Sequence, residues 1–204
     1  MDEQGFKRMV EVVQTNRGLS LVAAIYHVND KLTREADRER ATPWACRKGC
    51  SYCCYQLVLA TEAEWKEIER FFLSIRDPKV RIQLKQRLKP RMHEWSKWVR
   101  CQVRFQIGHP ASTELAYRAW LGKPCVFLGD EGECLIYPVR PIDCRTAFST
   151  EQCGSGQGGG MRFPYDWNGW ANNLILEEAK RLAGQRPIVL APLPYWLEWL
   201  DLLH

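Results

Sequence analysis

Long hydrophobic runs are missing from this 204-residue sequence. No apolar stretch approaches the ~20 residues that a membrane-spanning helix needs, so we expect no membrane partner. The first residues, Met1 to Gln4, are polar and acidic, and neither the apolar segment nor the small-residue cleavage site of a signal peptide follows them. We therefore expect a cytoplasmic protein.

Other familiar signals are missing too. Only four histidines are present, and they form no serine–histidine–acid arrangement with the rest of the sequence. The glycine-rich run at 154–160 is not followed by the Gly-Lys-Ser/Thr of a phosphate-binding loop. Hydrophobic residues make up 46% and charged residues 26% of the chain, which is ordinary globular composition and excludes a disordered or fibrous protein.

Most of the chain has the apolar spacing of amphipathic helices, which predicts a mainly α fold. Ser20 is placed to cap a second helix, and Thr61 to Glu64 fit a capping box. Pro90 is expected to kink or split a long basic helix. The predicted helical segments are 6–18, 21–32, 62–75, the basic segment within 76–104, 112–121, 170–183 and 195–203.

The stretch 124–164 lacks the helical spacing of apolar residues. It combines four prolines, several glycines and four cysteines. Ordered loops of this length are uncommon unless something cross-links them, and a metal site supplies such a link.

Nine cysteines are the most unusual feature of the composition. An odd number cannot pair completely within one chain, and in a reducing compartment clustered cysteines are more often metal-binding or catalytic than disulfide-bonded. Cys101 lies between Trp98 and Phe105 on a predicted helix and is expected in the core. The other eight form two groups: Cys46, Cys50, Cys53 and Cys54, and then Cys125, Cys134, Cys144 and Cys153.

The spacing within the first group favours metal binding. Short intervals let successive thiols from one turn converge on a metal at small loop-closure cost, and a distant group completes the site. Cys53 and Cys54 are adjacent, and neighbouring side chains usually point apart. We therefore expect them either to divide between two metals or to have one ligand and one thiol with a second role.

These segments also carry a resemblance. The order of the cysteine segments resembles that of the YkgJ-type cysteine-cluster family, which is named for a CxxCxxCC motif. The matching segments are Cys46 to Cys54, Pro124 to Leu128, Cys134 to Tyr137, Arg140 to Arg145, and Cys153. The chain departs from that motif in having three residues between the first two cysteines. The resemblance implies chelation of zinc or iron and supplies no reaction.

All-thiolate ligation suits both zinc and iron–sulfur clusters. The irregular spacing with its vicinal pair differs from that of zinc fingers and favours an iron–sulfur cluster, 4Fe–4S first, over zinc. Arg140 and Arg145 lie inside the ligand loop, where they can offset thiolate charge or donate hydrogen bonds to sulfur. We expect a small helical domain, 41–204, with irregular cysteine-rich loops organised around the metal site, preceded by a helical extension, 1–40. The predicted metal ligands are Cys46, Cys50, Cys53, Cys54, Cys125, Cys134, Cys144 and Cys153.

A first alternative is an enzyme. Cys46, Cys50 and Cys53, with Tyr52 before the last, also match the signature of radical S-adenosylmethionine proteins, although the repeated strand–helix units of that fold do not follow. Some proteins that resemble the cysteine-cluster family are linked to methyl transfer onto protein lysines. An iron–sulfur enzyme using S-adenosylmethionine therefore stays open.

A second alternative is a nucleic-acid-associated protein that uses the basic segment 76–104. This segment contains ten Lys or Arg residues and two acidic residues, together with Trp95 and Trp98. Such a segment can contact a nucleic-acid backbone and stack on bases. We favour a solvated helix whose buried stripe is Val80, Leu84 and Leu88, because no nucleic-acid-binding motif is present. A protein partner also stays open.

Overall fold

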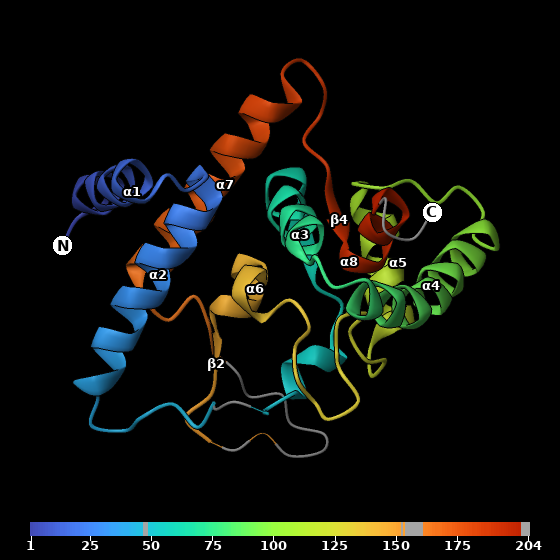
Figure 1. The fold of residues 1–204 in the computed structure, drawn as a ribbon, viewed down its shortest axis with the longest axis horizontal. Coiled ribbons are helices and arrows are strands. Elements are labelled where there is room, and N and C mark those ends of the chain that lie inside the picture. Colours follow the sequence, from blue (N-terminus) through green and yellow to red (C-terminus); the bar gives the residue numbers. More distant parts are fainter. Residues whose placement is uncertain (47–48, 152, 154–160, 201–204) are drawn as a thin grey trace.

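The computed structural model confirms the mainly α fold (Figure 1). It describes residues 1–46, 49–151, 153 and 161–200, and the glycine run at 154–160 lies outside them. Within these residues the α-helices are α1 (Glu3–Arg17), α2 (Leu21–Arg38), α3 (Glu62–Ser74), α4 (Pro78–Arg100), α5 (Pro110–Trp120), α6 (Ile142–Arg145), α7 (Asp166–Ala183) and α8 (Leu193–Trp196).

Two small antiparallel sheets connect segments that are distant in the sequence. In the first, β1 (Leu59–Thr61) pairs with β4 (Leu190–Pro192) and joins the chain after the first cysteine group to the C-terminal segment. In the second, β2 (Ala147–Phe148) pairs with β3 (Met161–Arg162). The described 3₁₀ helices are Tyr52–Tyr55, Tyr137–Val139 and Leu197–Trp199.

The predicted helix ends are confirmed where local capping decides them. The Ser20 hydroxyl accepts a hydrogen bond from the Ala23 amide at 3.1 Å and starts α2. At the start of α3, the Thr61 hydroxyl accepts from the Glu64 amide at 3.3 Å, while the Glu64 carboxylate accepts from the Thr61 amide at 2.9 Å. This is the predicted capping box. Gly18 ends α1 with a φ of 61°, which glycine adopts without strain.

Several predicted helices have different bounds in the structure; α2, for example, does not end at 32 but continues to Arg38. Helix α7 begins at Asp166, a turn ahead of the predicted start, because the Asn168 side chain accepts from the Tyr165 amide at 3.1 Å. The predicted C-terminal helix 195–203 is replaced by α8 and the 3₁₀ helix that follows it. Its proline-rich start favours a helix that begins earlier, and residues beyond 200 lie outside the described chain.

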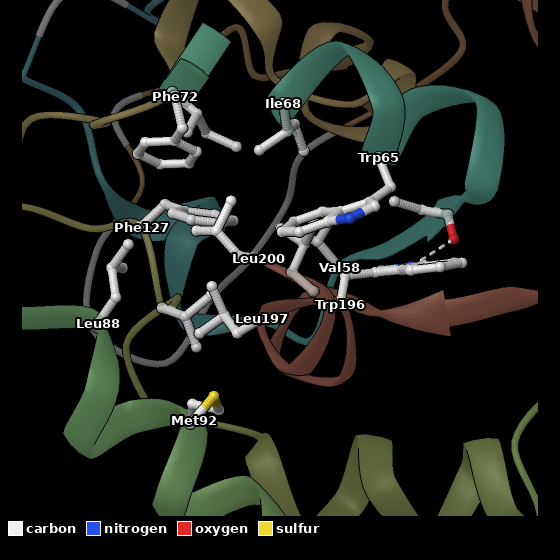
Figure 2. Packing of buried hydrophobic residues seen from close by; sticks show 14 of the residues in the cluster. Val58, Trp65, Ile68, Phe72, Leu88, Met92, Phe127, Trp196, Leu197 and Leu200 are labelled. Carbon is white, nitrogen blue, oxygen red and sulfur yellow. Dashed lines mark hydrogen bonds between the residues drawn. The ribbon is translucent and has the colours of Figure 1, made fainter. Parts of the chain in front are cut away.

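The first hydrophobic cluster joins α3, the second cysteine segment and the C-terminal segment (Figure 2). The rings of Trp65 and Trp196 stack with centroids 6.0 Å apart, and the Trp196 indole donates to the Ala60 carbonyl at 3.0 Å. Phe127 inserts beside Phe72. Three thiols of the second group pack against this cluster: Cys125, Cys134 and Cys144.

The second cluster is formed mainly by α1, α2 and α7, which Figure 1 shows on the opposite side of α3 from α4 and α5. The Asn168 amide donates to the Asn29 side chain at 2.7 Å, so the polar groups between α2 and α7 are paired. Ala63 and Ile142 also join this cluster, which brings it close to the cysteine segments. The predicted boundary between 1–40 and 41–204 stays a prediction.

The third cluster holds α4 against α5 through Trp95, Trp98 and Trp120. Helix α4 continues through Pro90 and is not split there. Of its predicted buried stripe, Leu88 is fully buried, but Val80 is 38% exposed. That part of the prediction is wrong because the first turns of α4 lie beyond the described core clusters. No helix in the described residues is both long and apolar enough to cross a bilayer.

Candidate metal centre

The first cysteine group follows an irregular path fixed by a few backbone contacts. The Ala45 amide donates to the Ser149 carbonyl at 2.7 Å, which places Cys46 beside the segment leading to Cys153. Gly49 has a φ of 89°, and this left-handed conformation turns the chain back before Cys50.

Cys53 and Cys54 lie on the 3₁₀ helix Tyr52–Tyr55, and their thiols hydrogen-bond to each other. Both line one cavity. The expectation that these side chains point apart is therefore wrong. A 3₁₀ helix has three residues per turn, so adjacent side chains are only about 120° apart instead of opposite as in a strand.

The second group is joined to the first through the backbone. The Cys125 amide donates to the Cys54 carbonyl at 2.6 Å. Cys134 then pairs with Leu128 in an isolated antiparallel bridge, and Cys144 lies on α6. The tertiary structure thus brings together thiols from two distant parts of the sequence.

These thiols surround a cavity of about 630 Å³. The rest of its wall is largely apolar and includes Val58, Phe127, Ile136 and Leu193. Seven of the eight predicted ligands line it: Cys46, Cys50, Cys53, Cys54, Cys125, Cys134 and Cys144.

The remaining cysteines have different positions. Cys153 is not part of the cavity wall but is an electrostatic neighbour of Cys46. Cys101 is exposed at the end of α4, so its predicted core position is wrong; the helix ends there, at the edge of the tryptophan cluster. All nine cysteines are free of disulfides. In the described part of the chain, no three His, Cys, Asp or Glu side chains are arranged to hold a metal ion.

Burial raises the pKa values of several thiols of the cavity. It raises the pKa of Cys125 to about 12 and that of Cys144 well above its ordinary value, with neighbouring thiols adding to the effect. The pKa of Cys54 is raised first by its hydrogen bond with Cys53 and then by burial. Burial also raises the pKa values of Cys46 and Cys134. A metal that binds here has to displace these protons.

Arg140 supplies positive charge at the cavity wall. Its guanidinium lies over the Tyr137 ring, 4.3 Å from the centroid, and opposes the burial-driven rise in the pKa values of Cys134 and Cys144. Its Nε is buried and has no hydrogen-bond partner among the residues that the structure describes. A buried donor beside several thiols fits an anionic sulfur-rich group, and the donor set therefore fits a thiolate-bound metal.

Arg145 has a different environment, because it is not part of the cavity wall. Its guanidinium donates to the Arg140 carbonyl at 2.8 Å and to the Pro138 carbonyl, and it forms an ion pair with Asp30 of α2. It also lies 4.0 Å from the centroid of the Tyr26 ring. These contacts hold the loop before Cys144 against α2. Its predicted role toward a metal or cofactor stays a prediction.

Two residues that hold the cysteine segments in place were not predicted from the sequence. The Arg91 guanidinium of α4 donates to the Cys125 carbonyl at 2.6 Å and to the Leu128 carbonyl at 3.2 Å. The buried Glu64 carboxylate accepts from the Ile142 amide at 2.8 Å and so fixes the start of α6. The capping box indicated where Glu64 is, but nothing in the sequence distinguished Arg91 from the other basic residues of α4.

The fold and the site define a helical protein whose irregular, cysteine-rich segments enclose a thiol-lined cavity. Residues 45–159, more than half of the chain, match the CxxCxxCC family, described as a "putative zinc- or iron-chelating domain". The chain belongs to this family, which confirms the resemblance found in the sequence. A comparison with curated proteins found no match, and neither did a comparison with solved structures.

Proposed function

We propose that this protein chelates a thiophilic metal through cysteine thiolates, with iron in an iron–sulfur cluster, 4Fe–4S first, ahead of zinc. The observation that carries the proposal is the single cavity lined by thiols from both sequence groups. The proposed ligands are Cys46, Cys50, Cys53, Cys54, Cys125, Cys134, Cys144 and Cys153.

The chemistry of the wall supports a soft metal. Sulfur is the dominant donor among the described lining residues, with Glu133 as the carboxylate present there. Thiolate ligands select zinc, copper(I) and iron–sulfur centres over magnesium or calcium. Arg140 lowers the cost of gathering several thiolates in one place.

The size of the cavity favours a polynuclear centre. A water molecule occupies ~30 Å³ of liquid, so a cavity of about 630 Å³ far exceeds the volume of one ion. A cluster occupies such a space better than a single zinc ion does. Such a site requires a reducing compartment such as the cytoplasm, since oxidised cysteines cannot serve as ligands.

The test is anaerobic purification of the full chain, followed by elemental analysis, acid-labile sulfide determination and a visible spectrum. We expect iron and sulfide with a brown charge-transfer absorption. Cys125→Ser should lose the metal, whereas the exposed Cys101→Ser should keep it. Tightly held zinc in a colourless protein would retain chelation and remove the cluster, and a protein without metal would contradict the proposal.

A second candidate function is an iron–sulfur enzyme that uses S-adenosylmethionine, for example to methylate a protein. The cavity volume lies within the range of ~300–1,000 Å³ typical of small-molecule sites, and its wall contains apolar residues such as Val58 and Phe148. Calorimetric titration of the iron-loaded protein with S-adenosylmethionine tests this function. Absence of binding heat, with adenosine triphosphate as the control ligand, would remove it.

Nucleic-acid binding receives less support from the structure. Trp95 is 1% exposed and so cannot stack on a base. Arg87 of the basic segment pairs with Asp130, and Arg91 binds backbone carbonyls. The basic charge of α4 is therefore partly used within the protein.

A further inference from the structure

We propose that Tyr26 of α2 is a positioning residue of the metal centre. Together with Glu64 and Arg145 it fixes the orientation of α6, which carries the Cys144 thiol. This inference rests on the proposed function and adds a residue that acts through one of the proposed ligands. Tyr26 precedes the residues 45–159 that match the family, so the family pattern does not indicate this role.

Helix α6 is a single turn that lies between two hydrophobic clusters. Its first residue, Ile142, is buried in the second cluster, whereas Cys144 packs against the first cluster and lines the cavity. The two side chains are two residues apart, so they point about 200° away from each other around the helix. A helix of four residues has too few backbone hydrogen bonds to be stable alone. Contacts with other elements therefore decide whether Cys144 faces the cavity.

The start of α6 is held by Glu64. The buried carboxylate of Glu64 accepts a hydrogen bond from the Ile142 amide at 2.8 Å. The same carboxylate accepts from the Thr61 amide at 2.9 Å and from the Tyr26 hydroxyl at 3.2 Å. Glu64 thus connects α6 both to the start of α3 and to α2.

The end of α6 is held by the buried Arg145. Its guanidinium lies 4.0 Å from the centroid of the Tyr26 ring and pairs with Asp30, one turn further along α2. It also donates to the Arg140 carbonyl at 2.8 Å. Tyr26 therefore acts on both ends of α6, because its hydroxyl binds Glu64 and its ring contacts the Arg145 guanidinium.

These contacts form one connected network of buried groups, in which the loss of one member leaves the others short of a partner. Without the ring and the hydroxyl of Tyr26, α6 loses support at each end, and the direction of Cys144 is no longer fixed. Removing a group that orients a metal ligand typically lowers metal affinity about 10- to 100-fold. We expect the lower end of that range for Tyr26, which acts through a helix and not through a bond to the ligand.

The first test uses the reduced, metal-free full chain. Limited alkylation with iodoacetamide, read at each cysteine by peptide mass spectrometry, gives the reactivity of Cys144 relative to that of Cys125 in the same cavity. Tyr26→Leu should raise this ratio roughly tenfold, and Tyr26→Phe, which keeps the ring, should raise it less. Val10→Ala is the matched control, because Val10 is buried in the same cluster as Tyr26 but on α1. It should leave the ratio unchanged.

The second test is a double-mutant cycle on Co²⁺ affinity, read anaerobically from the thiolate absorption of the bound ion. Tyr26→Leu should weaken binding roughly tenfold in the unaltered protein and have no further effect in Cys144→Ser, because it acts through that thiol. Val10→Ala should change the affinity equally in the two backgrounds. If far-ultraviolet circular dichroism shows that Tyr26→Leu does not fold, Tyr26→Phe serves for both tests, with a smaller expected change.

An alkylation ratio no higher in the Tyr26 variant than in Val10→Ala would overturn the positioning role. An equal loss of Co²⁺ affinity from the Tyr26 variant in the two backgrounds would overturn it as well. Both outcomes leave metal chelation standing. A chain that binds no Co²⁺ and carries no metal as purified would overturn the proposed function, and with it the role of Tyr26 at a metal centre.

Discussion

Removing the Asp30 carboxylate should weaken the loop that carries Cys144. Asp30 pairs with Arg145, whose side chain is 3% exposed. The same guanidinium binds the carbonyls of Pro138 and Arg140, so it connects α2 to the second cysteine segment. In Asp30→Ala this buried guanidinium loses its counter-charge.

The expected loss follows from the burial of the two partners. Breaking a fully buried ion pair by removing one partner costs about 3–5 kcal/mol. The Asp30 side chain keeps 29% exposure, so water replaces part of the interaction, and we expect a loss of about 2 kcal/mol. For a chain of this length that corresponds to a fall in Tm of roughly 4–8 °C.

Thermal unfolding followed by circular dichroism measures this loss, and the metal retained after dialysis against a chelator reports on the site. Glu35→Ala is the matched control on the same helix. Its pair with Lys31 spans 3.9 Å with both side chains 50% exposed, so its removal should cost about 0.5 kcal/mol or less. An Asp30→Ala effect no larger than that of Glu35→Ala would refute the reasoning.

Three further predictions test the site and its surroundings. Burial raises the pKa values of Cys125 and Cys144 above the ordinary 9.0, so the folded state retains protons that the unfolded chain releases. The metal-free protein should therefore lose stability as the pH rises from about 9 to about 12. Urea unfolding at each pH measures this loss, and unchanged stability over the range would contradict the burial argument. Arg91→Ala should reduce metal retention because it leaves two carbonyls of the second cysteine segment without their hydrogen-bond donor. The control Arg81→Ala, on the exposed part of the same helix, should retain metal as the unaltered protein does. Equal retention in the two variants would show that Arg91 does not position the segment. Gly169→Ala should raise the free energy of unfolding by about 0.5–1 kcal/mol, since a Cβ there meets no atom within 4 Å in the interior of α7, and a destabilised variant in urea unfolding would contradict this.

Helices were predictable from the sequence where neighbouring residues decide them. Ser20 and Thr61 form their caps with residues three positions away, so their hydrogen bonds follow from the local sequence. Val80 and Cys101 were misplaced because helical periodicity identifies a face but not whether another element covers it. The adjacent Cys53 and Cys54 were misjudged because the sequence does not reveal a 3₁₀ helix.

The sequence by itself determined the donor chemistry: many thiols in two groups, an odd number that cannot pair completely, and the pattern of the CxxCxxCC family. Only the tertiary structure decided which of these thiols face one another. The hydrogen bonds from Cys125 to Cys54 and from Ala45 to Ser149 join segments far apart in the chain, and sequence spacing does not encode such contacts. Likewise, Arg145 binds α2 through its ion pair with Asp30, a residue that is distant in the sequence and adjacent only in the folded chain.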